Sequence, residues 1–132
     1  MEIDFSTLRP AECYKVLSSL VTPRPIAWVS TMDEAGVVNA APFSFFNCFG
    51  SNPPVLAFAP GNKSPGLPKD TARNIRSNRE FVVNMADEAL AEKMVETSAS
   101  LPHGESELEA TGLTAAPSSS IAVPRIAEAP VA

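Results

Sequence analysis

Two short segments of the sequence carry residue types that can hold a reactive molecule in place. The first, NAAPFSFFNCFGSNPP at 39–54, places four phenylalanines within residues 43–49, among serine, asparagine, glycine and proline. The rings offer a flat apolar wall, and Ser44 and the main-chain N–H groups beside it offer hydrogen bonds. A planar ring system with polar atoms on its rim fits such a wall. The alternative is a strand whose phenylalanines only fill a core.

The second segment, KDT at 69–71, carries groups that bind an anion. Lys69 supplies a cation and Thr71 a hydroxyl, and a helix predicted over 69–78 starts here with Asp70 or Thr71 as its N-cap. Cations and helix N-termini are both favourable sites for phosphate. A flavin nucleotide combines a planar ring with a phosphate tail, so the two segments together fit it. In such a protein the cofactor brings the reactivity, and the chain supplies binding and orientation.

Residues for other kinds of catalysis are sparse. His103 is the only histidine, Cys13 and Cys48 lie far apart, and no G-x-G-x-x-G stretch is present. A single histidine gives little basis for a zinc site or for serine or cysteine nucleophilic catalysis. We interpret His103 as a solvated loop residue and the acids of GESELEA (104–110) as a solvated segment.

Composition and charge narrow the class of protein and partner. The chain has 132 residues, 45% of them hydrophobic, and a net charge of −5, which indicates one globular domain. Five bases and one acid lie between residues 60 and 79, a pattern that suits a small anion better than nucleic acid, although a solvated helix face explains it equally well. The absence of a long apolar run, a signal-peptide pattern and a disulfide framework predicts a cytoplasmic protein without a membrane segment.

The elements that must position the two segments are short. We expect a helix at 11–21, a hairpin of strands 26–31 and 37–47, strands at 54–59 and 80–85, a loop at 60–68, and helices at 69–78 and 86–100. Alternation along 43–49 places Phe43, Phe45, Asn47 and Phe49 on one face of the strand. Pro42 marks an edge or a bulge, and Trp28 is interpreted as a core residue. Strands and helices do not alternate regularly, so the pattern predicts an α+β fold or a small barrel.

Seven blocks of the sequence, in order, are similar to one known family. They are RPIAWVST (24–31), GVVNAAPFSFFN (36–47), NPPVLAF (52–58), KDTARNI (69–75), EFVVNM (80–85), GESELEATGLT (104–114) and PRIAEAPVA (124–132). The sequence resembles the flavin reductase-like, FMN-binding split-barrel family (FMN, flavin mononucleotide), and the resemblance extends from about residue 14 to residue 132. The resemblance implies a fold that is mainly β with short helices: a six-stranded Greek-key barrel that forms a homodimer, with FMN in a groove near the interface.

The resemblance also implies a set of site residues. Ser30 and Thr31 should line the ribityl–phosphate side, and 41–47 should follow the ring edge, with Ser44 near the reactive N5 atom. Lys69, Asp70 and Thr71 should meet the tail, supported by Asn74. The implied activity is transfer of a hydride from NAD(P)H or another donor to the flavin. The complete set is Ser30, Thr31, Ala41, Pro42, Phe43, Ser44, Phe45, Phe46, Asn47, Lys69, Asp70, Thr71 and Asn74.

The sequence departs from the family in its length. The family's chains continue beyond PRIAEAP, so we expect residues 1–132 to form a single domain that lacks the last strands of the barrel. Two other functions stay open for such a domain. It can be an FMN carrier that passes electrons without catalysis, or a flavin-free domain that acts as an interaction module.

Overall fold

The computed structural model describes residues 2–132 and is mainly β with short helices, as predicted. The helices are short, and 3-10 turns lie at Phe5–Thr7 and Glu88–Leu90. The α-helices are α1 (Pro10–Leu20), α2 (Asp70–Asn78), α3 (Ala91–Glu96) and α4 (Glu107–Thr111). The strands are β1 (Ala27–Met32), β2 (Val38–Phe43), β3 (Phe46–Ser51), β4 (Pro54–Phe58), β5 (Asn62–Ser64), β6 (Leu67–Pro68), β7 (Val82–Asn84), β8 (Ala115–Ala116) and β9 (Arg125–Ile126).

The centre of the fold is an antiparallel sheet in the order β2-β1-β7. Successive side chains of β1 point to opposite faces of the sheet. Trp28 therefore packs with Ala40, Leu108 and Ile126 on one face, while Ala27 and Val29 pack with Phe43 on the other. Trp28 is fully buried and its Nε1 donates to Thr97 Oγ1 over 3.0 Å, which confirms its interpretation as a core residue.

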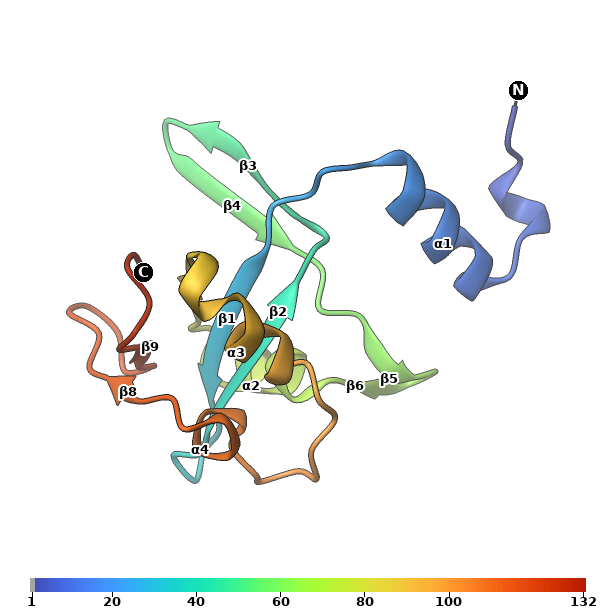
Figure 1. Cartoon of the computed structure of the whole chain (residues 1–132). Coiled ribbons are helices and arrows are strands. Elements are labelled where there is room, and N and C mark those ends of the chain that lie inside the picture. The colour runs from blue at the N-terminus through green and yellow to red at the C-terminus, as the bar shows by residue number, and fades with distance from the viewer. Residues whose placement is uncertain (1) are drawn as a thin grey trace.

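Helices α2, α3 and α4 pack on this sheet, whereas two other parts of the chain extend away from it (Figure 1). Helix α1 lies apart, joined to β1 by an extended segment, and none of its residues is buried. The hairpin of β3 and β4 projects on the other side and is largely exposed along both strands. The chain thus combines a packed centre with two exposed extensions.

The predicted strand 37–47 is interrupted, and the alternation predicted for 43–49 is wrong. Strand β2 ends at Phe43 and β3 begins at Phe46, with a bend at residues 44 and 45 between them. The bend resets the alternation, so Phe43 and Phe46 both pack in the cluster around Ala27 and Val29. Pro42 lies in the edge strand β2, opposite Trp28, and this part of the prediction is confirmed.

Four other predicted elements need correction. The N-cap of α2 is Lys69 instead of Asp70 or Thr71, because Asp70 is already the first helical residue. The loop 60–68 contains the short β5–β6 hairpin, and the helix predicted at 86–100 is reduced to a 3-10 turn followed by α3. The segment 104–110, predicted to be solvated, includes helix α4 and two buried side chains. Helix 11–21 is confirmed as α1.

Candidate functional site

The Phe-rich segment borders a hollow of about 350 Å³, called here the aromatic hollow. Its wall is built where the bend after β2 meets the loop after β4 and the side of α1. Lys69, from the start of α2, closes one end. The lining residues are Tyr14, Pro42, Phe43, Ser44, Phe45, Ala59, Pro60, Gly61, Asn62 and Lys69.

Aromatic and cationic side chains give this hollow its shape. Tyr14 of α1 stacks on Phe45, with ring centroids 5.5 Å apart and planes 23° from parallel. The Arg24 guanidinium lies 5.9 Å from the centre of the Phe45 ring, and its Nη1 donates to main-chain oxygens at the end of α1. Lys69 Nζ lies 5.4 Å from the centre of the Phe43 ring. These contacts leave a flat apolar surface with a cation at its edge.

A second hollow of about 50 Å³, the polar hollow, lies on the other side of Lys69. Lys69 lines both hollows and, within residues 2–132, forms no ion pair. Its ammonium group is therefore available to an anion. The other lining residues are Asn39, Ala41, Lys63, Asp70, Thr71, residues 97–101 and Glu107.

The carboxylate of Asp70 contacts three basic side chains at the rim of the polar hollow. Its carboxylate lies 2.7 Å from Lys63 Nζ, 3.4 Å from Arg73 Nη1 and 3.0 Å from His103 Nδ1. Burial tends to raise the pKa of Asp70, but the hydrogen bonds and charges of Lys63 and His103 outweigh it and hold that pKa below its usual value. Asp70 thus ties α2 to the β5–β6 hairpin and to the loop before α4. His103, predicted to be only solvated, is half-exposed and contacts this carboxylate.

Beneath the start of α2 lies a chain of buried hydrogen bonds, called here the polar network. Glu107 Oε2 accepts from Asn39 Nδ2 over 2.7 Å and from the Ala40 N–H over 3.1 Å. Asn39 Oδ1 accepts from Thr71 Oγ1 over 2.9 Å and from Thr31 Oγ1 over 3.3 Å. Asn74 Nδ2 donates to Thr31 Oγ1 over 3.1 Å. The network therefore joins α4, β2, α2 and β1.

Glu107 is the functional candidate that sequence reasoning missed. The prediction that the acids of 104–110 are solvated holds for Glu105 and Glu109 but is wrong for Glu107, which is only 7% exposed. Burial raises the pKa of Glu107, against the hydrogen bonds from Ala40 and Asn39 that lower it. The available signal was weak: Ser106 at the helix start and the buried Leu108 next to Glu107 indicate an amphipathic turn.

The structure places the predicted site residues in three groups. Ala41, Pro42, Phe43, Ser44, Phe45, Lys69, Asp70 and Thr71 line one of the two hollows or both. Ser30, Thr31 and Asn74 are almost fully buried and hydrogen-bonded inside the protein. Thr31 and Asn74 support the start of α2 through the polar network, whereas Ser30 donates to the Pro124 carbonyl on the opposite face of the sheet. Phe46 packs in the core, and Asn47 is exposed on β3, so the structure does not bring these two to the hollows.

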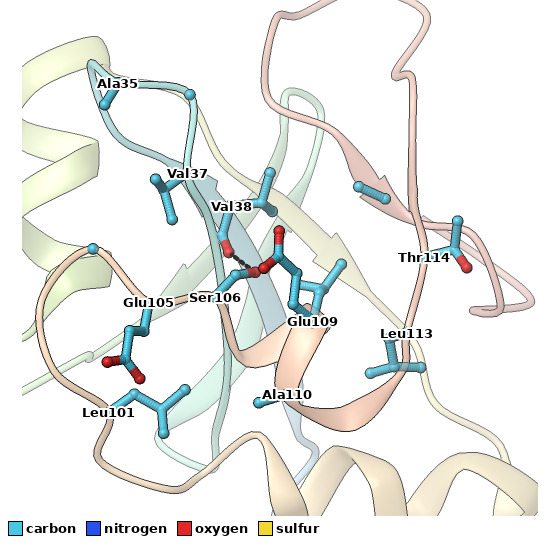
Figure 2. Close-up of a pocket in the computed structure, with 14 residues that line it drawn as sticks. Ala35, Val37, Val38, Leu101, Glu105, Ser106, Glu109, Ala110, Leu113 and Thr114 are labelled. Atoms are coloured by element: carbon cyan, nitrogen blue, oxygen red, sulfur yellow. Dashed lines mark hydrogen bonds between the residues drawn. The ribbon is translucent and has the colours of Figure 1, made fainter.

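A larger hollow, of about 740 Å³, lies elsewhere, between α4 and the turn that joins β1 to β2 (Figure 2). In Figure 2, Ser106 Oγ donates to the Val38 carbonyl across its floor. Its lining carries Glu105 and Glu109, and among the lining residues in the described chain there is no lysine or arginine. An anionic ligand is therefore better accommodated by the two hollows that share Lys69.

Comparisons with known proteins agree on one family. The family model described as "Flavin reductase like domain" matches residues 18–132. The chain is 50% identical over 124 residues to the uncharacterized protein YwrF of Bacillus subtilis, covering 94% of this chain and 60% of YwrF. The chain thus spans about 60% of the length of such curated relatives.

Solved structures show the same fold. Nitrilotriacetate monooxygenase component B from Bacillus cereus superposes with a TM-score of 0.91 at 39% identity, covering 98% of this chain and 63% of that one. A protein of Shewanella frigidimarina with a split barrel domain superposes with a TM-score of 0.78 at 26% identity, covering 98% of this chain and 64% of that one. The fold is therefore that of the split-barrel flavin reductases, as predicted.

Proposed function

The chain belongs to the flavin reductase-like family, and from that membership we propose that it binds FMN and passes electrons from NAD(P)H through the flavin to an acceptor. The observation that carries the proposal is the position of Lys69. This cation stands between an aromatic hollow and a polar hollow. A ligand with a flat ring and an anionic tail fits this arrangement, with its ring in the aromatic hollow and its tail beside Lys69 and the polar hollow.

The residues present fit a flavin. Phe43, Phe45 and Tyr14 offer the apolar wall for the ring, and Ser44 lies among them as a hydroxyl at the ring's edge. The first turn of α2 provides main-chain N–H groups that have no partner within the helix, and Lys69 adds a full positive charge. These groups suit a phosphate. Thr71 is buried and donates its hydroxyl hydrogen to Asn39, so it acts as a support.

The flavin, when bound, supplies the hydride and electron chemistry. The chain's own part is to exclude water from the ring, hold it at a fixed angle and neutralise the tail. The two hollows need no nucleophile or acid–base pair for this. Ser44 is placed to hydrogen-bond the polar rim of the ring, and Lys69 to balance the charge of the tail.

One further feature supports a homodimer. Leu17, Leu20, Phe49 and Leu56 are exposed on α1 and on the β3–β4 hairpin, a distribution that fits burial in a homodimer. No helix within residues 2–132 is long and apolar enough to cross a membrane. A cytoplasmic location and one domain over 1–132 stay predictions, and Met1, the first residue of that predicted domain, lies outside the described residues.

One experiment separates this function from its alternatives. The purified protein is soaked with FMN and desalted, its absorbance spectrum is recorded, and NADH and NADPH oxidation is measured with and without added FMN. Bound flavin together with turnover supports the oxidoreductase. Bound flavin that neither nucleotide reduces supports a carrier. Protein that stays colourless and inactive overturns the proposal and favours the flavin-free interaction module.

A further inference from the structure

Glu107 lies beneath the polar hollow, on the side of the molecule where the proposed function places the flavin's anionic tail. We propose that Glu107 is a positioning residue for that tail and acts through Asn39 and Thr71. The inference rests on the proposed function. It adds a residue from α4, a helix that lines the polar hollow through Glu107 but takes no part in the aromatic hollow.

Helix α4 is fastened to β2 by its first residues. Ser106 Oγ donates to the Val38 carbonyl over 2.6 Å, and Glu107 Oε2 accepts from the Ala40 N–H over 3.1 Å. Leu108, next along the helix, is 2% exposed and packs with Trp28 in the core. Glu107 is therefore held in one place from both sides. A buried charged side chain fixed in this way has a structural or functional purpose that an exposed one does not need.

The Glu107 oxygen Oε2, which accepts two hydrogen bonds, decides which way the Asn39 amide points. A carboxylate only accepts hydrogen bonds, so the Nδ2 group of Asn39 must face it and Oδ1 must face the opposite way. Oδ1 then accepts from Thr71 Oγ1 over 2.9 Å and from Thr31 Oγ1 over 3.3 Å. An apolar side chain at position 107 would remove this constraint and leave the amide without a fixed orientation.

The orientation of Asn39 in turn fixes the start of α2. Thr71 is 1% exposed and lies in the first turn of the helix, beside Lys69 and Asp70. Its hydrogen bond to Asn39 holds that turn against β2. The free N–H groups of the turn and the Lys69 ammonium group then keep their positions relative to the polar hollow. Loss of Glu107 should therefore weaken binding of a phosphate-bearing flavin and leave binding of the bare ring nearly unchanged.

The test compares FMN with riboflavin, which has the ring but no phosphate. Dissociation constants are measured by fluorescence titration on the wild type, Glu107→Ala and Glu109→Ala, and urea unfolding of each flavin-free protein is recorded. Glu109 is exposed on the same helix and is the matched control. We expect Glu107→Ala to weaken FMN by about tenfold and riboflavin by less than about twofold, the scale of one lost hydrogen bond. We expect Glu109→Ala to change neither.

A charge-matched exchange keeps the test decisive even if Glu107→Ala folds poorly. Asn39→Asp alone sets two carboxylates against each other and should weaken FMN by at least about tenfold. Asn39→Asp combined with Glu107→Gln keeps the net charge. The amide nitrogen introduced at position 107 then donates to the carboxylate introduced at position 39, while the Ala40 N–H loses the acceptor that Glu107 Oε2 gave it. The new carboxylate again offers an acceptor to Thr71, so the double variant should recover part of the FMN affinity that Asn39→Asp alone loses.

The outcomes separate the two proposals. A wild type that binds neither flavin overturns the proposed function. A wild type that binds FMN while Glu107→Ala does so equally well overturns the role of Glu107. Equal weakening of FMN and riboflavin, or an exchange that restores nothing, also overturns it, because each outcome indicates a general structural effect instead of positioning of the tail.

Discussion

The polar network and the β3–β4 hairpin are built in opposite ways. In the network, Thr31, Asn39, Thr71, Asn74 and Glu107 are each at most 7% exposed and satisfy one another with hydrogen bonds. In the hairpin, Phe49, Val55 and Leu56 are 72%, 42% and 51% exposed. A cluster of polar side chains is thus packed inside, whereas the Phe-rich segment leads into an exposed arm.

This difference shows that the anion end and the ring end of the proposed site are held in place by different kinds of contact. Two asparagines make the contrast clear. Asn39 joins three side chains from α4, α2 and β1, whereas Asn47, within residues 2–132, accepts only from the neighbouring Cys48 N–H. The geometry of the anion end is therefore determined by contacts inside the chain. The geometry of the ring end depends more on the protein surface that covers the β3–β4 hairpin.

The largest effect on stability is expected when Asn39, the residue that links the other members of the polar network, is replaced. Asn39→Ala leaves Glu107, Thr71 and Thr31 without their shared partner in a buried region, and we expect a loss of about 3 kcal/mol in the free energy of unfolding. Asn47→Ala, in the exposed hairpin, should change it by less than about 0.5 kcal/mol. Urea unfolding measures both. Equal effects at the two positions would mean that the contrast between the regions has no energetic basis.

The next effect concerns the cation between the two hollows. Lys69→Ala should weaken FMN by about 1.5–3 kcal/mol, the usual range for a hydrogen bond to a charged group, and should leave riboflavin nearly unaffected. Arg76→Ala is the matched control, because Arg76 is an exposed base in the last turn of the same helix. Fluorescence titration gives both constants. An unchanged FMN constant for Lys69→Ala would remove Lys69 from the site.

Local signals in the sequence were enough to predict most of the elements. The turn MDEAG between two apolar segments gave the β1–β2 hairpin, and the residue types around Lys69 gave α2. The bend at residues 44 and 45 was not predictable in this way. It carries no glycine, and it forms because Phe43 and Phe46 both find space in one apolar cluster, which is a tertiary effect.

The site was predicted where residue type alone identifies the chemistry. Lys69 and Ser44 line the aromatic hollow. Residue type alone identified both as candidates, Lys69 as a cation at a helix start and Ser44 as a hydroxyl within an aromatic segment. Glu107 was missed because its partner Asn39 lies far away in the sequence and because acids in a polar segment are usually solvated. For the same reason Ser30 and Thr31, predicted to line the site, are buried instead: Thr31 supports the start of α2 through Asn39, and Ser30 donates to the Pro124 carbonyl away from the hollows.

A smaller effect is expected at the ring end. Ser44→Val keeps the side chain small but removes its hydroxyl, so reduction of bound flavin by NAD(P)H should slow by the equivalent of about 0.5–1.5 kcal/mol. Stability should change by less than about 0.5 kcal/mol. Ser51→Ala, exposed at the far end of β3, is the control and should alter neither quantity. Stopped-flow reduction traces that match the wild type would exclude Ser44 from the ring's edge.

The smallest expected effect is the pH dependence of the stability contributed by Glu107 and Asp70, the two carboxylates of the polar hollow. It tests the contrast between a buried and a partly exposed group. Burial raises the pKa of Glu107 above its ordinary value of 4.5. The folded state then binds more protons than the unfolded state, so the wild type loses stability relative to Glu107→Gln as pH rises above about 4.5. Glutamine does not titrate, so any change in this difference with pH comes from Glu107.

Asp70 should behave in the opposite way. Burial tends to raise its pKa, but Lys63 and His103 together hold it below the ordinary value of 3.8. The stability that Asp70 contributes is therefore present above that value and is lost as pH falls through the lower folded pKa. Solvent screens the partly exposed partners, so the difference from Asp70→Asn should be modest.

Urea unfolding of both variants from about pH 3 to pH 8 should give differences that change in opposite directions, because one carboxylate is stabilised by nearby cations and the other is mainly desolvated. Parallel changes would mean that Glu107 is solvated in solution, and the polar network would then lose its central acceptor.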